Sequence, residues 1–570
     1  MQSTRVTPVF VTWLVLVPLI MSNLAHAGHQ PNILLLVAED LSPRVGAYGD
    51  TIAQTPNIDA LARSSVKYTN AFTTAGVCAP SRAALIMGMH QISFGAQHMR
   101  TSTGPLGPYL AKPPGDAKAF PEILRMHGYY TYTDRKLDYQ FSGIRAGTGP
   151  FTIWDADGAA DTGWRNRQTA QPFFGLINFI ETHESGVMRA HGEPYSETHA
   201  GTQQFRKALG VVAEPSTNPE LVEIPPYYPD LPQVRQDLAS HYDNIAAMDQ
   251  RVGQILTALI EDGLFDDTII IWTSDHGDGL PRAKRELFDS GIKVPMLMSI
   301  PPQLREPFIA PPAQMPQTDD RLVSFVDLAP TILAFANIEA PGFLHGRSVF
   351  HEPREFVYAS RDRIDEVVDR QRAIRSQGFK YIRSWHPDVP GGHSLAYRDN
   401  LDMVRAMREA FTQGTLNAHQ ARWFEAVGEE QLYNLQNDPH ELHNLADAEA
   451  YASQKRRMAQ ALEKFLKTIG DTSTESESLM RESLLEAGQI PRTPTPKLTR
   501  QGDFLVVHTP PGSSSAFQMH NSTTWQLYKD PIPLNVGEHA TESARIKVKA
   551  VRYGWQESAV AEYAWSEHSD

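Results

Sequence analysis

The sequence holds a single cysteine, Cys78, in a setting that could make it reactive. Small residues precede it, and the run Cys-Ala-Pro-Ser-Arg continues through Arg82 into an apolar stretch typical of a helix. A residue just ahead of a helix N-terminus meets backbone N–H groups and the positive end of the helix dipole, which favour an anion. Arg82 could reach the same place. The alternative is an inert thiol buried before a helix, which is common for an isolated cysteine.

Two further sets of polar residues each follow a mostly apolar run. Glu39 and Asp40 directly follow the stretch 31–38, and Asp275 and His276 directly follow a second run at 268–274. Such runs are typical of buried parallel strands, and ligands bind at the carboxyl ends of strands in open α/β sheets. Adjacent carboxylates repel each other unless a cation neutralises them. Glu39 and Asp40 therefore allow a metal site, with a solvated strand-to-loop turn as the alternative.

Length and composition limit the class of protein. The 570 residues are too many for one compact core and predict two or three domains. The hydrophobic fraction of 41% and the charged fraction of 21% are those of a globular protein. The net charge of −14 implies no basic surface for nucleic acid.

The first 27 residues predict a signal peptide. A short positive start leads into an apolar core at 9–21, and Ala-His-Ala at 25–27 is a small-x-small cleavage site. A retained membrane anchor is the alternative, but the run is short for a span and contains Pro18. We expect an exported protein, periplasmic or secreted, with no membrane anchor after cleavage. A free thiol is a liability in an oxidising compartment, and conversion of Cys78 to another group would remove that difficulty.

The pattern Cys-x-Pro-Ser-Arg at 78–82 resembles the signature of type I sulfatases of the alkaline phosphatase superfamily. In that family the cysteine is oxidised after synthesis to Cα-formylglycine, an aldehyde whose hydrate attacks sulfur. The order of motifs extends the resemblance over roughly residues 30–465: acid pair, cysteine loop, lysine, histidine, Asp-His pair and second lysine. The runs at 282–291 and 182–185 look most like heparan N-sulfatase (sulfamidase) and its bacterial relatives.

The resemblance implies an α/β, alkaline-phosphatase-like fold with a large central mixed sheet flanked by helices and a smaller α+β C-terminal subdomain. Alternating segments late in the chain predict an appended all-β module, similar to fibronectin type III modules. A stretch rich in Thr, Ser, Pro and charge before it predicts a linker. The expected division is a signal peptide at 1–27, a catalytic domain at 28–354, the C-terminal subdomain at 355–480, the linker at 481–500 and the β module at 501–570.

The resemblance also assigns roles to matching positions. The catalytic residues it implies are Cys78 as formylglycine, Arg82, Lys136, His183 and Lys284. The metal ligands it implies are Glu39, Asp40, Cys78, Asp275 and His276. Oxygen-rich ligands favour Ca²⁺ or Mg²⁺, and the histidine leaves Mn²⁺ open. Ca²⁺ is favoured because the family usually carries it.

The mechanism implied is covalent catalysis. The metal and Arg82 would stabilise the ionised nucleophile, while Lys136 and Lys284 would offset charge on the sulfuryl oxygens. His183 or Lys284 would protonate the leaving alcohol or amine. A base, either His183 or Asp275, would then take the proton of the second hydroxyl so that sulfate leaves and the aldehyde returns.

Two positions depart from the family pattern. Glu39 stands where an aspartate is usual, and Asp138 stands where the family's Lys-x-His motif has its histidine. Only Lys136 of that motif is therefore carried over, and Asp138 could orient this lysine or a sugar hydroxyl. Further candidates for substrate contact are His98, Arg100 and Glu184. An ordinary surface loop is an equal alternative for the first two.

We expect a hydrolase that releases sulfate from an O-sulfate ester or N-sulfo group of a sulfated carbohydrate. Its partner would be a formylglycine-generating enzyme or an anaerobic sulfatase-maturating enzyme, acting on Cys78. The alternatives are a phosphodiesterase or phosphonate monoester hydrolase of the same superfamily, and a non-catalytic carbohydrate-binding relative. Release of sulfate rather than phosphate distinguishes the first alternative, and any turnover distinguishes the second.

Overall fold

The structure is a computed structural model that describes residues 30–188, 194–305, 308, 317–520, 522–534 and 544–565. The predicted signal peptide at 1–27 lies outside the described residues, as do residues 535–543 and 566–570 of the expected β module. Among the described residues, no helix combines the length and the apolar character that a bilayer span requires.

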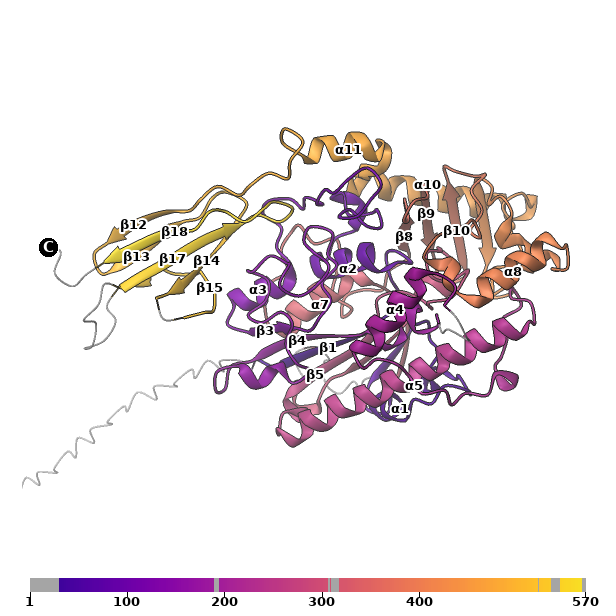
Figure 1. The fold of residues 1–570 in the computed structure, drawn as a ribbon, viewed down its shortest axis with the longest axis horizontal. Helices are drawn as coiled ribbons and strands as arrows, with labels where there is room; N and C mark the ends of the chain where they lie inside the picture. Colours follow the sequence, from indigo (N-terminus) through magenta and orange to yellow (C-terminus); the bar gives the residue numbers. More distant parts are fainter. Residues whose placement is uncertain are drawn as a thin grey trace, which may run out of the picture. The chain divides into compact units, whose positions relative to one another are not determined.

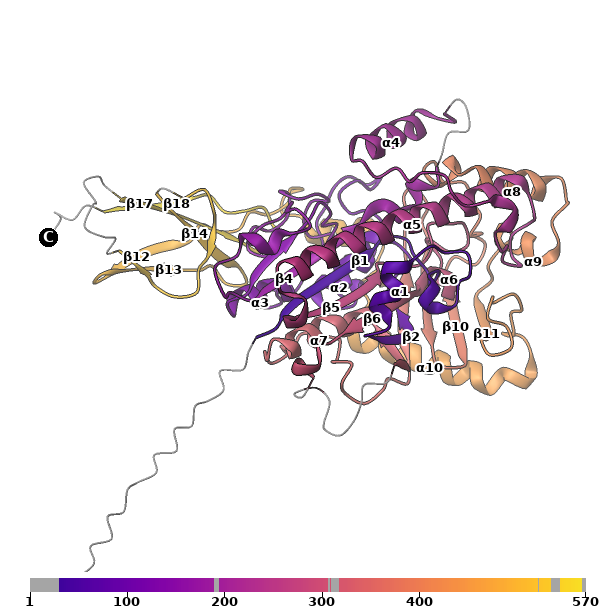
Figure 2. The ribbon, with the colours of Figure 1, turned by 90° about the horizontal axis from the view of Figure 1, so that it is seen from below.

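A seven-stranded mixed sheet forms the centre of the fold (Figures 1 and 2). Its strand order is β3-β4-β1-β5-β6-β2-β7. Strand β6 runs antiparallel to both of its neighbours, and the other neighbouring pairs are parallel. The strands are β1 (Asn32–Ala38), β2 (Val66–Phe72), β3 (Tyr130–Thr133), β4 (Phe173–Phe179), β5 (Thr268–Ser274), β6 (Lys293–Ser299) and β7 (Thr318–Ser324).

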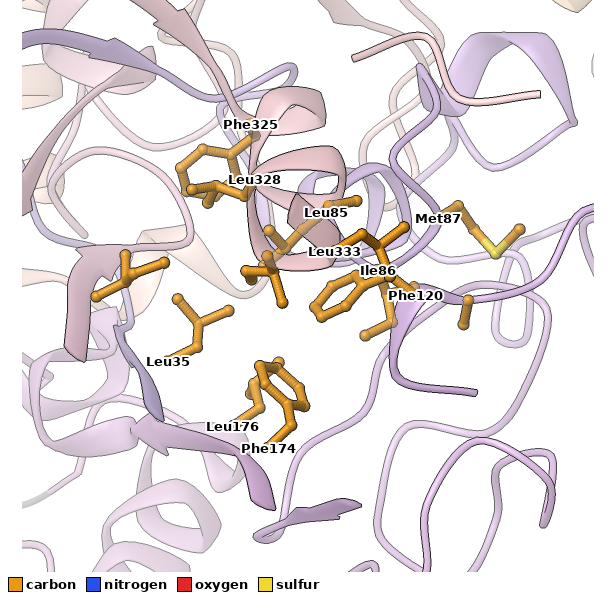
Figure 3. Close-up of a cluster of buried hydrophobic side chains, with 14 of the residues drawn as sticks. Leu35, Leu85, Ile86, Met87, Phe120, Phe174, Leu176, Phe325, Leu328 and Leu333 are labelled. Carbon is orange, nitrogen blue, oxygen red and sulfur yellow. The ribbon is translucent and has the colours of Figure 1, made fainter. Parts of the chain in front are cut away.

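Both faces of this sheet are buried, which is why its central strands read as unbroken apolar runs. Along β1, Ile33 and Leu35 belong to one core cluster, while Leu34 and Leu36 belong to the other. The first cluster is completed by helices α2 (Cys78–Met87), α3 (Phe120–Met126) and α7 (Leu328–Phe335). The second is completed by α1 (Pro56–Ala62), α5 (Pro232–Glu261) and α8 (Asp402–Thr412). Figure 3 shows the first cluster, in which side chains of the sheet meet those of the helices: Leu35, Phe174 and Leu176 with Leu85, Phe120 and Leu333.

A smaller α+β unit follows the central sheet along the chain. Its antiparallel sheet has the order β11-β10-β9-β8, and α10 packs on it through Met458 and Leu462. The strands are β8 (Val357–Arg361), β9 (Gln371–Arg375), β10 (Phe379–Ser384) and β11 (Glu430–Asn434). The remaining helices are α4 (Glu197–Ala208), α6 (Asp289–Ile292), α9 (Ala418–Ala421), α10 (Ala452–Ile469) and α11 (Glu477–Leu484).

The end of the described chain is all-β, as the alternating sequence predicted. It forms two antiparallel sheets with the orders β12-β13-β16 and β15-β14-β17-β18 around a core that includes Leu505 and Val548. The strands are β12 (Lys497–Gln501), β13 (Phe504–His508), β14 (Ser514–Met519), β15 (Gln526–Leu527), β16 (Ile532–Pro533), β17 (Ala544–Val551) and β18 (Ala561–Trp565). The last turn of α11 and the start of β12 fall within 481–500, where the sequence predicted a linker. The predicted α/β class, with its mixed sheet, α+β subdomain and β module, is confirmed.

Candidate active site

The candidate residues meet at the carboxyl end of the central parallel strands. Glu39 and Asp40 directly follow β1, and Asp275 and His276 directly follow β5. His183 follows β4 after one short 3-10 turn. The four residues after β1 and β5 are buried, and His183 is half-buried. Parallel strands deliver their terminal side chains to one edge of a sheet, so residues far apart in the sequence become neighbours.

Cys78 is the first residue of α2 and is fully buried. Its Sγ lies 3.3 Å from His276 Nε2 and 3.9 Å from Asp40 Oδ1. The helix is fixed to the sheet because the Ser81 hydroxyl donates to the backbone carbonyl of Asp275 at 2.5 Å. The cysteine therefore begins the helix beside the acidic residues, whereas the sequence placed it just ahead of the helix.

The acidic residues and the cysteine are close enough to share one ion. Ligand-type atoms of Asp40, Cys78, Asp275 and His276 all lie within 4.8 Å of one another. His276 Nε2 is 3.0 Å from Asp40 Oδ1 and 3.6 Å from Asp275 Oδ1. Burial lowers the pKa of His276, but the carboxylates of Asp275 and Asp40 raise it to about 10. The carboxylates of the cluster thus stabilise a positive charge at His276.

This donor set fits a hard divalent cation. Glu39 Oε1 is buried and accepts no hydrogen bond within the described part of the chain, with Arg82 Nη2 3.4 Å away. Asp40 and Asp275 add fully buried carboxylates beside it. Buried carboxylates this close together need a compensating cation, and carboxylate oxygens are preferred ligands of Ca²⁺ and Mg²⁺.

Two lysines, Lys284 buried and Lys136 half-buried, approach the same acids from different loops. Lys284 Nζ lies 2.6 Å from Asp40 Oδ2 and 3.3 Å from His183 Nε2. Lys136 Nζ lies 2.7 Å from Glu39 Oε2. Burial lowers the pKa of Lys284, but the Asp40 carboxylate raises it well above its ordinary value, so this lysine stays a cation. The site therefore carries positive charge at Glu39 and at Asp40, the two acids that follow β1.

Arg82 is held by a chain of hydrogen bonds that the sequence did not indicate. Its Nε donates to Asp275 Oδ2 at 3.0 Å, and its Nη1 donates to Asn178 Oδ1 at 2.5 Å. Asn178 in turn donates to Asp134 Oδ1 at 2.5 Å. Asn178 lies inside the apolar run of β4 and Asp134 in a polar turn, so neither had a spacing signal that could have revealed it.

His183 is the neutral neighbour of a lysine cation. Burial lowers its pKa well below the ordinary value, and the positive charge of Lys284 lowers it further. Its Nε2 lies 3.3 Å from Lys284 Nζ, while its Nδ1 accepts a hydrogen bond of 3.2 Å from the Ser185 N–H and lies 2.9 Å from the Ser185 hydroxyl. The pair therefore contains a protonated amine beside an imidazole that can accept a proton.

Three of the candidates for substrate contact form ion pairs near the site. Both oxygens of Asp138, which lies two residues after Lys136, accept hydrogen bonds of 2.8 Å from Arg100. Both oxygens of Glu184 accept hydrogen bonds of 2.8 Å from Arg285, and Lys284 Nζ is 3.2 Å from Glu184 Oε1. The Arg100 side chain is 25% exposed, whereas its partner Asp138 is buried.

His98 lies in a different environment. It is buried, its Nδ1 accepts a hydrogen bond of 3.2 Å from the backbone of Arg363, and the same atom is 3.9 Å from Glu477 Oε2. These contacts join the loop to α11 and to the segment after β8, and no contact among the described residues joins His98 to Cys78. Its predicted role in substrate binding stays a prediction.

Comparison with known proteins agrees with this geometry. The family model described as Sulfatase matches residues 31–148 and 156–338. An ulvan-active sulfatase of Formosa agariphila is 34% identical over 94% of this chain and 92% of its own length. The N-sulphoglucosamine sulphohydrolase of Homo sapiens is 26% identical over 74% of this chain and 87% of its own length.

A solved structure of a 2-O GAG sulfatase shares the fold with a TM-score of 0.55 and 18% identity, covering 78% of this chain and 94% of that one. The family match and the relatives define a sulfuric ester hydrolase, and its fold is alkaline-phosphatase-like. The chain belongs to the sulfatase family, whose members hydrolyse sulfate esters and sulfamates.

Proposed function

We propose that this chain is an exported sulfatase that removes sulfate from a sulfated glycan by means of a formylglycine at residue 78. The observation that carries the proposal is the place of Cys78, buried at a helix N-terminus and 3.3 Å from His276 in a cluster of carboxylates. The names of its relatives, which act on ulvan and on N-sulphoglucosamine, support a sulfated carbohydrate as the substrate.

A divalent cation, Ca²⁺ before Mg²⁺ or Mn²⁺, would be held by Glu39, Asp40, Asp275 and His276. Once bound there it would supply stabilisation of negative charge on the nucleophile and on a sulfate oxygen. Formylglycine would supply a hydrated aldehyde whose oxygen attacks sulfur and is later released by C–O cleavage. A plain thiolate at this position would instead stay trapped as a dead-end adduct.

The lysines would hold the sulfate group. The half-buried Lys136 and the buried Lys284 contact different carboxylates of the cluster, so a sulfate between them would be neutralised by both. Such preorganised charges stabilise a transition state more strongly in a water-poor site than in bulk water. Arg82, fixed by Asp275 and Asn178, adds a third cation at the nucleophile.

Proton transfer would be divided between Lys284 and His183. Lys284 keeps its proton because of Asp40 and would donate it to the leaving alcohol or amine. His183 is neutral and would accept the proton whose loss allows sulfate to leave. The opposite pKa shifts of the two groups, which lie 3.3 Å apart, support this division of the roles that the sequence left open.

The test is peptide mass spectrometry across residue 78 on protein from its native host, joined to an assay for released sulfate. Conversion replaces the SH group and one hydrogen by a carbonyl oxygen, so the modified peptide is lighter by that difference. We expect the lighter peptide and sulfate release, and we expect neither from Cys78→Ala. An unmodified thiol without turnover would contradict the proposal, and faster release of phosphate or phosphonate would favour the other hydrolases of the superfamily.

The same preparation tests export and maturation. The N-terminal peptide of the mature protein should begin after Ala27 if the signal peptide is cleaved. Protein made in a host that lacks a formylglycine-generating or anaerobic sulfatase-maturating enzyme should keep the thiol. A mature chain that retains residues 1–27 would contradict the export proposal without affecting the assignment of the active site.

A further inference from the structure

The β module contributes a residue to the core of the catalytic domain. Tyr553, two residues after β17, is 3% exposed and belongs to the core cluster on one face of the central sheet, whereas the module's own core is a separate cluster. The neighbouring Gly554 has a φ of +77°, and a Cβ there would lie 2.2 Å from the backbone oxygen of Ala111. The module therefore fits closely against the catalytic domain at this turn.

A buried carboxylate anchors this contact. Glu122 of α3 is 0% exposed, and its Oε2 accepts hydrogen bonds of 2.5 Å from both the Tyr553 hydroxyl and the Thr152 hydroxyl. Its Oε1 accepts a hydrogen bond from Ser514 of β14. The turn after β17 and strand β14 thus supply two of the three side-chain hydrogen bonds to this buried carboxylate, and loss of such partners for a buried charge is costly.

Tyr553 also holds the loop that carries Lys136. Its ring stacks on Phe141 with centroids 4.9 Å apart and planes 10° apart, and the Gly554 N–H donates to the Phe141 carbonyl at 3.3 Å. Phe141 lies five residues after Lys136 in the same loop, and the Leu137 N–H bonds to the Ile144 carbonyl at 2.9 Å across it.

The side chains of this loop alternate between the core and the active site. Leu137, Tyr139 and Phe141 belong to the core cluster that contains Tyr553. Lys136 and Asp138 instead contact Glu39 and Arg100 in the candidate site. Movement of the core side of the loop would therefore displace the groups on its other side.

We propose that the β module is a built-in support of the active site, in which Tyr553 positions the loop bearing Lys136 and Asp138. It follows that the catalytic domain without the module would lack part of its own core. The expected effect on turnover rests on the proposed role of Lys136, whereas the expected effect on loop exchange does not. Tyr553 is a positioning residue, since it acts through Phe141 and touches no reacting atom.

The test compares Tyr553→Leu with Tyr563→Leu in the full-length matured enzyme. Tyr563 packs against the module's own core, so its variant controls for loss of a tyrosine ring from the module. Hydrogen exchange of peptides spanning 136–146 and kcat and KM for an aryl sulfate are measured for both. A displacement of about 1 Å at a reacting site can cost on the order of a hundredfold in rate.

We expect Tyr553→Leu to speed exchange in 136–146 and to lower kcat/KM by at least about tenfold per folded molecule. Tyr563→Leu should change neither, and Tyr553→Phe, which keeps the stacked ring, should restore most of the activity. Loop exchange and kcat/KM equal to those of Tyr563→Leu would overturn the proposal. If Tyr553→Leu does not fold, Tyr553→Met, which also removes the stacked ring, is measured in its place, and unchanged loop exchange in that protein would overturn the proposal equally. Exchange needs no turnover, so it still decides the matter if the proposed activity fails.

Discussion

Replacement of Lys284 by methionine isolates one charge of the candidate site. The substitution keeps the length of the side chain and removes a cation whose Nζ lies 2.6 Å from Asp40, 3.2 Å from Glu184 and 3.3 Å from His183. If this amine binds sulfate and donates the proton, the variant loses a preorganised donor to the transition state. Loss of one such donor costs about 3 to 4 kcal/mol, so kcat should fall by on the order of 100- to 1000-fold.

The same substitution should leave the metal site intact. Lys284 competes with a bound cation for Asp40, so its removal should keep Ca²⁺ affinity unchanged or make it tighter. Titration calorimetry with Ca²⁺ therefore distinguishes loss of one charge from collapse of the site. Steady-state assays should show kcat and kcat/KM falling together, because the lost interaction is made in the transition state.

Lys293→Met is the matched control. Lys293 is a half-buried lysine at the start of β6, and it lines a separate cavity of about 250 Å³ with Arg44 and Tyr227. Its replacement should leave kcat within about threefold of the parent, as for changes away from the chemistry. A loss below about threefold in Lys284→Met, or an equal loss in both variants, would refute the assigned role of Lys284.

Three further outcomes are expected. Removal of divalent cations by a chelator should lower the Tm and abolish turnover. Added Ca²⁺ should raise the Tm in proportion to the logarithm of its concentration, and a Tm independent of Ca²⁺ would contradict the metal proposal. Burial lowers the pKa of His98 from its ordinary 6.5 to about 4, although Glu477 opposes the shift. The contribution of neutral His98 to the free energy of unfolding is then fully present above pH 6.5 and is lost as pH falls towards 4, by about 3 kcal/mol in total. Denaturant titrations of His98→Gln should therefore show a weaker pH dependence than those of the parent over that window. Arg100→Gln should raise KM for a sulfated oligosaccharide at least about fivefold while leaving KM for an aryl sulfate within about twofold, and equal effects on both would contradict a role in sugar recognition.

Local sequence patterns predicted the central strands, and the resemblance to sulfatases implied how they are arranged. Strands such as β1 and β5 are buried on both faces, so every residue in their middle is apolar and the polar residues begin where the strand ends. The burial of both faces and the position of the site at the carboxyl edge both follow from a largely parallel α/β sheet, and each leaves a pattern in the sequence. This is why Asp40 and Asp275 could be placed together from positions 235 residues apart.

Contacts that depend on tertiary packing alone had no such pattern. Asn178 supports Arg82 from within an apolar strand, and Glu122 looks like an ordinary surface residue of a short helix until Tyr553 and Ser514 reach it. The module was predicted as an appendage because the alternation of apolar and polar residues indicates strands but does not indicate what the turns between the strands contact. Only the folded chain reveals that the residue two positions after β17 completes another domain's core.

The departure at position 138 has an electrostatic explanation in the structure. An aspartate in place of a histidine adds negative charge near Lys136, which would weaken the attraction of that lysine for sulfate. Arg100 cancels this charge through two hydrogen bonds of 2.8 Å, so the pair as a whole is neutral while Lys136 keeps its contact with Glu39. Because Arg100 remains a quarter exposed, the compensating cation also lies at the surface, where a further anionic or hydroxyl group of the substrate could meet it. The Asp138–Arg100 pair thus adds no net charge beside Lys136, and the aspartate changes only the polar groups around that lysine.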